Sequence, residues 1–230
     1  MKKDKLIFKD MESKESKQHW LNRELKDAEH TYHIPGVRTA FPLSFHRRNL
    51  TAVDIGSNLG AFCLYAKDIF QNIYGFEASY NTFLAGRENI KQLDNIKTYN
   101  LAASRFDDEI LKIAVCPTTE LSRDTSFFHV SGQKNENIEE VKTISLDGIY
   151  KKCKIDYIDY LKIDCEGSEY EFLMDKDLSK IDYLTMEIHP GYIGNTKAKE
   201  LLLYLNKYFI LNYTIGEHIL FYRSKTPYAS

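Results

Sequence analysis

The chain has 230 residues, of which 43% are hydrophobic and 28% charged, and its net charge at pH 7 is −2. These values are typical of a globular protein with one substantial core. The small net charge argues against a surface built for nucleic acid. No window approaches the roughly 20 apolar residues of a membrane helix, and no secretory peptide is visible. The four cysteines lack zinc-site spacing, so we expect reduced thiols and a cytoplasmic protein.

Residues 1–49 differ in pattern from the rest of the chain. A helix is predicted over residues 13–32, because Ser13 is a suitable N-cap and Trp20 and Leu21 begin a weak apolar stripe. Two prolines and a glycine predict a loop over residues 33–42. We therefore expect an N-terminal helical arm or cap over residues 1–49, followed by a single domain over residues 50–230. The arm either helps to form a substrate pocket or covers the sheet.

From residue 50 onwards, apolar strand patterns alternate with helical patterns, which predicts a parallel sheet with right-handed crossovers. The predicted strands span residues 50–55, 73–77, 97–101, 157–164 and 181–189. The predicted helices span residues 58–70, 80–93, 145–152, 168–174 and 196–207. Residues 105–145 break this alternation with two further strands, 110–115 and 141–144, around a polar stretch. Residues 209–214 and 219–222 predict a final antiparallel pair.

The stretch over residues 50–60 reads as a buried strand, a glycine turn and the start of a helix. Gly56 permits a sharp turn and a close approach of a ligand to the backbone, with Ser57 beside it. Asn58 is the expected N-cap of the helix, and Gly60 is expected in its first turn. Free N–H groups at this helix start would favour a carboxylate or another anion.

The spacing of this turn bears on the ligand that it accepts. A dinucleotide fingerprint requires G-x-G-x-x-G, but Asn58 stands where the second glycine belongs. Asp54 would repel a pyrophosphate, whereas it suits a cation such as the sulfonium or ammonium group of S-adenosylmethionine. The alternative is a generic strand-to-helix turn with a buried, hydrogen-bonded Asp54.

Glu77 ends the next predicted strand and follows Gly56 by about 20 residues. In nucleotide-binding α/β folds, a carboxylate at this distance accepts hydrogen bonds from ribose hydroxyls. We therefore predict that Glu77 binds the ribose of the cofactor. The alternative is a solvated residue at the end of a strand.

Four blocks of sequence, at residues 53–60, 76–78, 161–169 and 186–189, together resemble the FkbM-type S-adenosylmethionine-dependent methyltransferases. The K-I-D-x-E-G block at residues 162–167 is the most specific of them. The resemblance covers about residues 50–222 and does not extend to the first fifty residues. It implies a class I methyltransferase fold of the α/β, Rossmann-like type, with a seven-stranded, mostly parallel sheet whose last strand is antiparallel. It also implies O-methylation, often of sugars or natural products.

The resemblance extends the expected cofactor site. The segment after the third strand resembles the adenine-side loop of the family. The resemblance implies that Asn100 and Ser104 reach the purine, although an asparagine and a serine in a loop are more often turn residues. The residues expected to bind S-adenosylmethionine are Asp54, Gly56, Ser57, Asn58, Gly60, Glu77, Ala78, Ser104 and Asp164.

Asp164, Glu187 and His189 are the expected catalytic residues, because they follow parallel strands that end at the same edge of the sheet. His189 is the first choice of general base, since its unperturbed pKa lies near neutrality, and Asp164 is the second. Glu166 is expected mainly to bind backbone N–H groups. An alternative is that the three catalytic candidates hold Mg²⁺, although they form no recognised metal-ligand motif. His189 is otherwise a structural residue before Pro190.

The expected function is transfer of a methyl group from S-adenosylmethionine to a hydroxyl of a sugar, a glycan or a small natural product. Two other classes stay open at this point. One is a catalytically degenerate protein that binds S-adenosylmethionine, and the other is a nucleotide-dependent Rossmann oxidoreductase. No nucleic-acid partner is expected.

Overall fold

The computed structural model describes residues 50–115, 137–215 and 219–226. The arm predicted over residues 1–49, including its helix, lies outside the described residues, as does most of the polar stretch before residue 141. No helix in the described ranges combines the length and apolar character needed to cross a bilayer.

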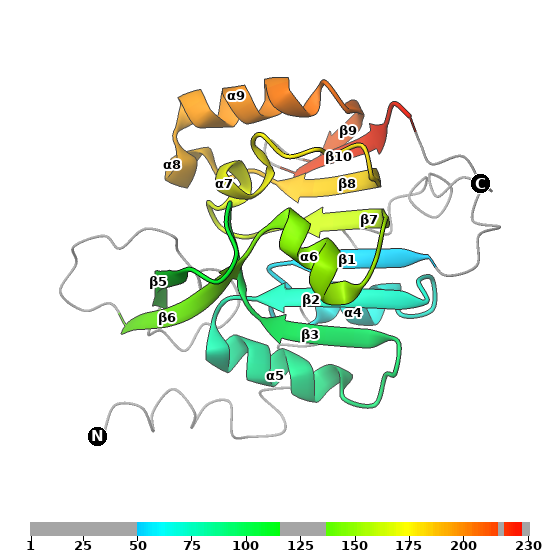
Figure 1. Ribbon diagram of the computed structural model, residues 1–230, viewed down its shortest axis with the longest axis vertical. Coiled ribbons are helices and arrows are strands. Elements are labelled where there is room, and N and C mark those ends of the chain that lie inside the picture. Colours follow the sequence, from blue (N-terminus) through cyan, green and yellow to red (C-terminus); the bar gives the residue numbers. More distant parts are fainter. Residues whose placement is uncertain (1–49, 116–136, 216–218, 227–230) are drawn as a thin grey trace.

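A seven-stranded sheet forms the centre of the molecule, in the order β3-β2-β1-β7-β8-β10-β9 (Figure 1). Its strands are β1 (Thr51–Ile55), β2 (Asn72–Glu77), β3 (Ile96–Asn100), β7 (Ile158–Ile163), β8 (Ile181–Glu187), β9 (Phe209–Ile215) and β10 (Ile219–Ser224). The pairs among β1, β2, β3, β7 and β8 are all parallel. The last strand, β10, runs antiparallel to both β8 and β9. This order and direction confirm the predicted class I methyltransferase fold.

Helices cover both faces of this sheet and produce three layers. On one face, α4 (Ala61–Ala66) and α5 (Tyr80–Ile90) pack in one hydrophobic cluster. On the other face, the larger cluster includes side chains of four helices: α6 (Leu146–Cys153), α7 (Glu169–Leu173), α8 (Pro190–Ile193) and α9 (Asn195–Leu205). Figure 1 shows α6 in front of the sheet and α4 behind it.

The residues of β1 show why this segment is almost entirely apolar. Successive side chains of a strand point to opposite faces of the sheet. Ala52 accordingly packs with α4 and α5, whereas Val53 and Ile55 pack with α6, α7 and α9. Because both faces are covered, every residue of β1 is buried, including Asp54.

Strands within residues 102–115 and 137–144 form a separate small sheet, as the break in the alternation predicted. Its strands are β4 (Ala102–Ala103), β5 (Ile110–Val115) and β6 (Asn137–Ile144), in the order β4-β6-β5. β5 and β6 pair antiparallel, with Ile110 opposite Lys142. The two strands project beyond the ends of β2 and β3 (Figure 1). The small sheet therefore stands beside the edge where the parallel strands end.

The predicted helix over residues 58–70 is wrong in its bounds, because α4 begins only at Ala61 and ends at Ala66. Asn58 is not its N-cap. Gly60 takes that position, in the left-handed conformation with φ 81°, and its N–H donates to the carbonyl oxygen of Ser57 at 2.8 Å. Five residues of turn, 56–60, therefore lie between β1 and the helix, which the apolar pattern alone does not show.

Other local predictions agree with the structure. Ser145 caps α6, since its hydroxyl accepts a hydrogen bond from the N–H of Gly148 at 3.0 Å. The predicted helix over residues 196–207 corresponds to α9, and the predicted final pair corresponds to β9 and β10.

Candidate active site

The glycine turn after β1 lies directly against the end of β7. Gly56 has φ 71°, and a Cβ atom added there would lie 1.7 Å from the carbonyl oxygen of Asp164. The N–H of Asp164 donates to the carbonyl oxygen of Ile55 at 3.0 Å. The need for glycine at position 56 therefore comes from contact between two backbone segments of the protein itself.

The first N–H groups of this turn have partners within the protein. Those of Gly56 and Ser57 both donate to the carbonyl oxygen of Phe76, at 2.9 and 3.0 Å. The N–H of Asn58 donates to Oε2 of Glu77 at 2.9 Å. The expectation that N–H groups at the start of the turn face an anionic ligand is therefore wrong for these three residues. They tie the turn to the end of β2 instead.

Glu77 is buried, and each of its carboxylate oxygens accepts one backbone hydrogen bond. Oε2 accepts from Asn58 and Oε1 accepts from Ser79, both at 2.9 Å. Burial raises the pKa of Glu77 to about 7, although these two hydrogen bonds act in the opposite direction. An ionised carboxylate offers about four acceptor positions. Glu77 thus keeps capacity for two further donors, such as a pair of ribose hydroxyls.

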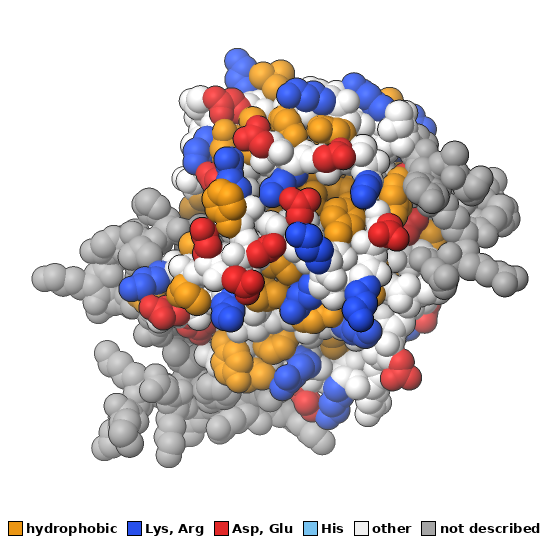
Figure 2. Space-filling view, viewed as in Figure 1, with side chains coloured by type: hydrophobic (Ala, Val, Ile, Leu, Met, Phe, Trp, Pro, Cys, Tyr) orange, Lys and Arg blue, Asp and Glu red, His pale blue; other side chains and the backbone are white. Residues whose placement is uncertain are grey.

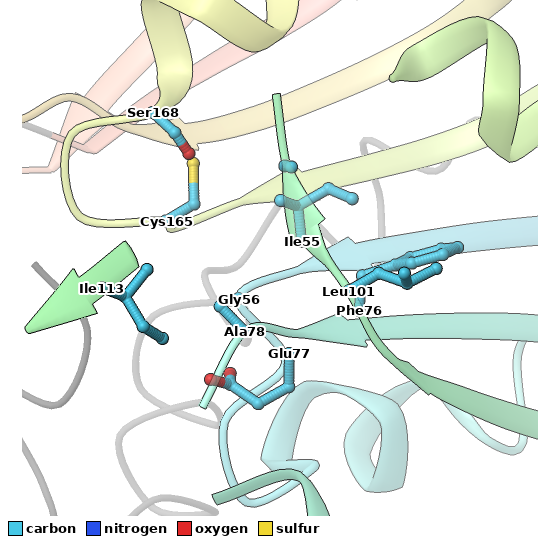
Figure 3. Close-up of a pocket in the computed structure, with 10 residues that line it drawn as sticks. Ile55, Gly56, Phe76, Glu77, Ala78, Leu101, Ile113, Cys165 and Ser168 are labelled. Carbon is cyan, nitrogen blue, oxygen red and sulfur yellow. The ribbon is translucent and has the colours of Figure 1, made fainter. Parts of the chain in front are cut away.

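A small pocket opens beside Glu77 at the carboxyl edge of the sheet (Figure 3). Its lining comes from β1, β2, β5 and the turns after β2, β3 and β7, and consists of Ile55, Gly56, Phe76, Glu77, Ala78, Leu101, Ala103, Ile113, Cys165 and Ser168. Cys165 and Ser168 face Glu77 across the space, with Ile113 to one side. Apolar walls around one carboxylate with free acceptor positions are chemically of the kind that binds a nucleoside.

The structure places the other predicted cofactor residues around this pocket rather than in its wall. Ser104 does not line the pocket, and its N–H donates to the carbonyl oxygen of Ile144 at 2.9 Å. The side-chain amide of Asn100 donates to the carbonyl oxygens of Glu77 and Ala78, at 2.9 and 2.8 Å. Asn100 therefore supports the loop that carries Glu77.

Asp54 is fully buried and forms an ion pair with Lys162 of β7. Nζ of Lys162 lies 3.1 Å from Oδ1 of Asp54 and donates to the carbonyl oxygen of Gly56 at 2.9 Å. Burial raises the pKa of Asp54, and Lys162 partly offsets this shift. The carboxylate that the sequence assigned to the cationic end of the cofactor is thus already paired with a lysine. Lys162 is not among the residues predicted for the site. A lysine within an apolar, buried strand is nevertheless rare and indicates a specific charged partner.

A second group of polar side chains gathers where β7 and β8 end, and we call it the acid–histidine cluster: Asp164, Glu166, Glu187 and His189. Nε2 of His189 lies 3.4 Å from Glu166, 3.7 Å from Glu187 and 4.0 Å from Asp164, measured to the nearest carboxylate oxygen. The three predicted catalytic residues are therefore close together. Glu166, which was expected to bind backbone N–H groups, is the nearest of the acids to Nε2.

Glu169 of α7 supports the cluster from the buried side. Its side chain is fully buried, and Oε1 lies 2.6 Å from Nδ1 of His189. The same oxygen accepts a hydrogen bond from the N–H of Gly167 at 3.0 Å. Glu169 thus fixes the orientation of the imidazole ring and turns Nε2 toward the three acids. This role of Glu169 is not among the predictions made from the sequence.

The acids change the protonation of His189. Burial by itself would lower the pKa of His189, but the hydrogen bond with Glu169 and the charges of Glu169, Glu166 and Asp164 outweigh it and raise the pKa to about 9. Burial also raises the pKa of Glu166 to about 7, against the effect of His189. At neutral pH, His189 therefore carries a proton and a positive charge.

One turn belongs to both the pocket and the cluster. Cys165 and Ser168 line the pocket, whereas Asp164 and Glu166 belong to the acid–histidine cluster. A ligand in the pocket and a second molecule at the cluster would therefore bind on adjoining parts of the same sheet edge.

Solved structures with a similar arrangement are distant in sequence. A putative rRNA-methylase from Clostridium thermocellum has 10% identity and a TM-score of 0.49, over 83% of this chain and 95% of that one. TrmK from M. capricolum, in complex with S-adenosylhomocysteine, has 14% identity and a TM-score of 0.44, over 84% and 70%. SMU.1697c from Streptococcus mutans, a putative methyltransferase in complex with S-adenosylhomocysteine, has 10% identity and a TM-score of 0.47, over 77% and 89%.

A search of curated protein sequences gives no match. The profile of the methyltransferase FkbM domain, in contrast, matches residues 54–212, which is well over half of the chain. This span contains the glycine turn, Glu77 and the whole acid–histidine cluster. The chain therefore belongs to the FkbM methyltransferase family, and its cofactor is S-adenosylmethionine.

Proposed function

We propose that this protein transfers the methyl group of S-adenosylmethionine to a hydroxyl oxygen of a sugar, a glycan or a small natural product. The observation that carries the proposal is the adjacency of two unlike sites at one sheet edge. The pocket beside Glu77 suits an adenosyl group, and the acid–histidine cluster next to it presents polar side chains suited to a hydroxylated acceptor. The family favours methyl transfer over the oxidoreductase alternative.

The residues of the chain divide the task between binding and activation. Glu77 would hold the ribose hydroxyls, while Gly56, Ser57, Asn58, Gly60 and Ala78 shape the turns around the cofactor. Asp54, paired with Lys162, would act through the backbone of Gly56 rather than by direct contact. Ser104 is proposed at the adenine side, close to the small sheet.

Asp164, Glu187 and His189 are proposed to orient and activate the acceptor. In the reaction, the acceptor oxygen attacks the methyl carbon, the carbon–sulfur bond breaks with its electron pair returning to sulfur, and the hydroxyl proton is lost. His189 was the first choice to take that proton, but its pKa of about 9 leaves only about one molecule in a hundred unprotonated at pH 7. Activation of the hydroxyl therefore falls to the cluster as a whole.

A small or saccharide acceptor fits the surface better than a nucleic acid does. On the face shown in Figure 2, lysines and arginines alternate with aspartates and glutamates. The described residues on this face show no continuous basic stripe that would follow a phosphate backbone.

The direct test is methyl transfer from labelled S-adenosylmethionine to a library of hydroxyl acceptors. We expect His189→Ala to keep its affinity for S-adenosylhomocysteine, measured by calorimetry, and to lose at least about tenfold in turnover, because positioned acid–base groups contribute 10²–10⁴-fold. Turnover unchanged in this variant would remove His189 from the activating group. Binding of S-adenosylhomocysteine by the unaltered chain without transfer to any acceptor would favour the catalytically degenerate alternative.

A further inference from the structure

We propose that the acid–histidine cluster is a binding site for one divalent cation, best suited to Mn²⁺, with Asp164, Glu166 and His189 as ligands and Glu187 beside them. This inference rests on the proposed function for the purpose of the ion, which is to hold and activate the acceptor hydroxyl. Binding of the ion itself can be measured without the reaction.

The spacing of the ligand atoms carries the proposal. One donor atom from each of Asp164, Glu166 and His189 lies within 4.8 Å of the other two. From Nε2 of His189, the nearest oxygens of Glu166, Glu187 and Asp164 are 3.4, 3.7 and 4.0 Å away. An octahedral ion with bonds of about 2.1 Å places its ligand atoms about 3.0 Å apart when adjacent and about 4.2 Å apart when opposite. The three separations measured from Nε2 fall between these values.

The charges of the cluster also call for a cation. Three carboxylates share one opening, with side chains 36%, 22% and 36% exposed for Asp164, Glu166 and Glu187. Nζ of Lys162 lies 3.9 Å from Oδ2 of Asp164, but it already forms the closer ion pair with Asp54. Like charges this close together repel one another unless a positive charge lies among them. The imidazole of His189 supplies one such charge while it is protonated, and a divalent ion that replaced the proton on Nε2 would supply two.

Glu169 provides an observation independent of the spacing. A histidine that binds a metal ion usually donates its other ring N–H to a carboxylate, which fixes the tautomer and orients the ring. Glu169 stands in this position, fully buried and 2.6 Å from Nδ1 of His189. Its other oxygen, Oε2, is buried without a hydrogen-bond partner among the described residues. Through Oε1, the buried Glu169 is thus placed as the carboxylate partner that a metal-binding histidine usually has.

The types of ligand narrow the choice of ion. Carboxylates suit Mg²⁺, Ca²⁺ and Mn²⁺, while an imidazole favours transition metals. Mn²⁺ satisfies both preferences. A bound divalent ion lowers the pKa of a hydroxyl attached to it, and the released proton passes to water through the opening. Three protein ligands leave three positions of an octahedral ion open, so the site would select acceptors with neighbouring oxygens, such as a sugar diol.

The experiment is a titration of the full chain with Mn²⁺, followed by electron paramagnetic resonance, in which the signal of free Mn²⁺ falls as the ion binds. We expect one ion per chain. Glu166→Gln and Asp164→Asn should each weaken binding by at least about tenfold, because even residues that only support metal ligands contribute 10–100-fold. Glu88→Gln, the same change on the exposed side of α5, should leave the titration unchanged.

Equal titrations of the unaltered chain and of a folded Glu166→Gln variant would overturn the site. Methyl transfer to hydroxyls that a chelator does not slow, in a chain that leaves the Mn²⁺ signal unchanged, would also overturn it while the proposed function stands. Stoichiometric binding of Mn²⁺ without transfer to any acceptor would support the site and remove the proposed function.

Discussion

Glu77 and Glu166 are both partly or fully buried acids with a pKa of about 7, yet their surroundings differ. The carboxylate of Glu77 accepts hydrogen bonds from two backbone N–H groups of adjoining turns. The carboxylate of Glu166 faces a histidine and two further acids from neighbouring strands. The carboxylate of Glu77 is thus held by backbone hydrogen bonds, whereas the acid–histidine cluster depends mainly on contacts between side chains. Substitutions that alter the backbone should therefore disrupt the turns around Glu77. Substitutions that alter charge should disrupt the acid–histidine cluster.

The largest effect is expected from Gly56→Ala. A Cβ atom at position 56 would lie 1.7 Å from a backbone oxygen, at a φ of 71° that L residues rarely adopt. We expect the free energy of unfolding to fall by more than about 4 kcal/mol, which would unfold many domains of this size. Urea denaturation followed by circular dichroism measures the change. Gly191→Ala is the control, because a Cβ atom there meets nothing within 4 Å.

Lys162→Met is expected to come next. This change leaves the fully buried carboxylate of Asp54 without its cationic partner. Removal of one member of a buried ion pair typically lowers stability by about 3–5 kcal/mol. The double variant Asp54→Asn with Lys162→Met should recover part of the loss, as measured by the same denaturation. A single variant as stable as the unaltered chain would show that the pair does not hold the turn.

Glu77→Ala should lower the affinity for the cofactor more than it lowers the stability of the fold. The change removes the acceptor of two backbone hydrogen bonds and of the proposed ribose hydroxyls. Hydrogen bonds to charged groups contribute about 1.5–3 kcal/mol each, so affinity for S-adenosylhomocysteine should fall by at least about tenfold. Calorimetric titration provides the measurement. Equal affinity in the variant would mean that the ribose is bound elsewhere.

A smaller effect is expected from pH. Because the pKa of Glu77 in the folded protein is raised from 4.5 to about 7, the charged form predominates only above pH 7. Ribose hydroxyls favour the charged form, so affinity for S-adenosylhomocysteine should rise with pH between 5.5 and 7, by at most about tenfold per pH unit, and then level off. In the protein without cofactor, the same shift lowers stability as pH rises from 4.5 to 7. Glu77→Gln should flatten the affinity profile over this range.

The fold could be predicted from the sequence because its signals are local. The composition of residues 50–55 and 157–164 is enough to predict apolar strands, and Ser145 indicates the start of α6. The start of α4 could not be predicted in this way, because it depends on the left-handed conformation of Gly60.

The site was predictable only in part. Glu77, Asp164 and His189 stand at strand ends, and the rule for parallel sheets is enough to bring them to one edge. Lys162 and Glu169 act through contacts that the folded chain creates. Lys162 contacts Gly56, 106 residues away, and Glu169 reaches His189 from another element. Neither contact corresponds to a periodic pattern in the sequence from which it could be predicted.

The turn from Asp164 to Ser168 contributes to both sites, and this has an effect on how the two ligands influence each other. A shift of the turn on filling one site would alter the geometry offered to the other. Thermodynamic reciprocity then requires that any help the donor gives to acceptor binding is returned in equal measure. Methyl transfer would thus be favoured when both sites are filled. After the reaction, S-adenosylhomocysteine would dissociate more readily once the methylated product has left.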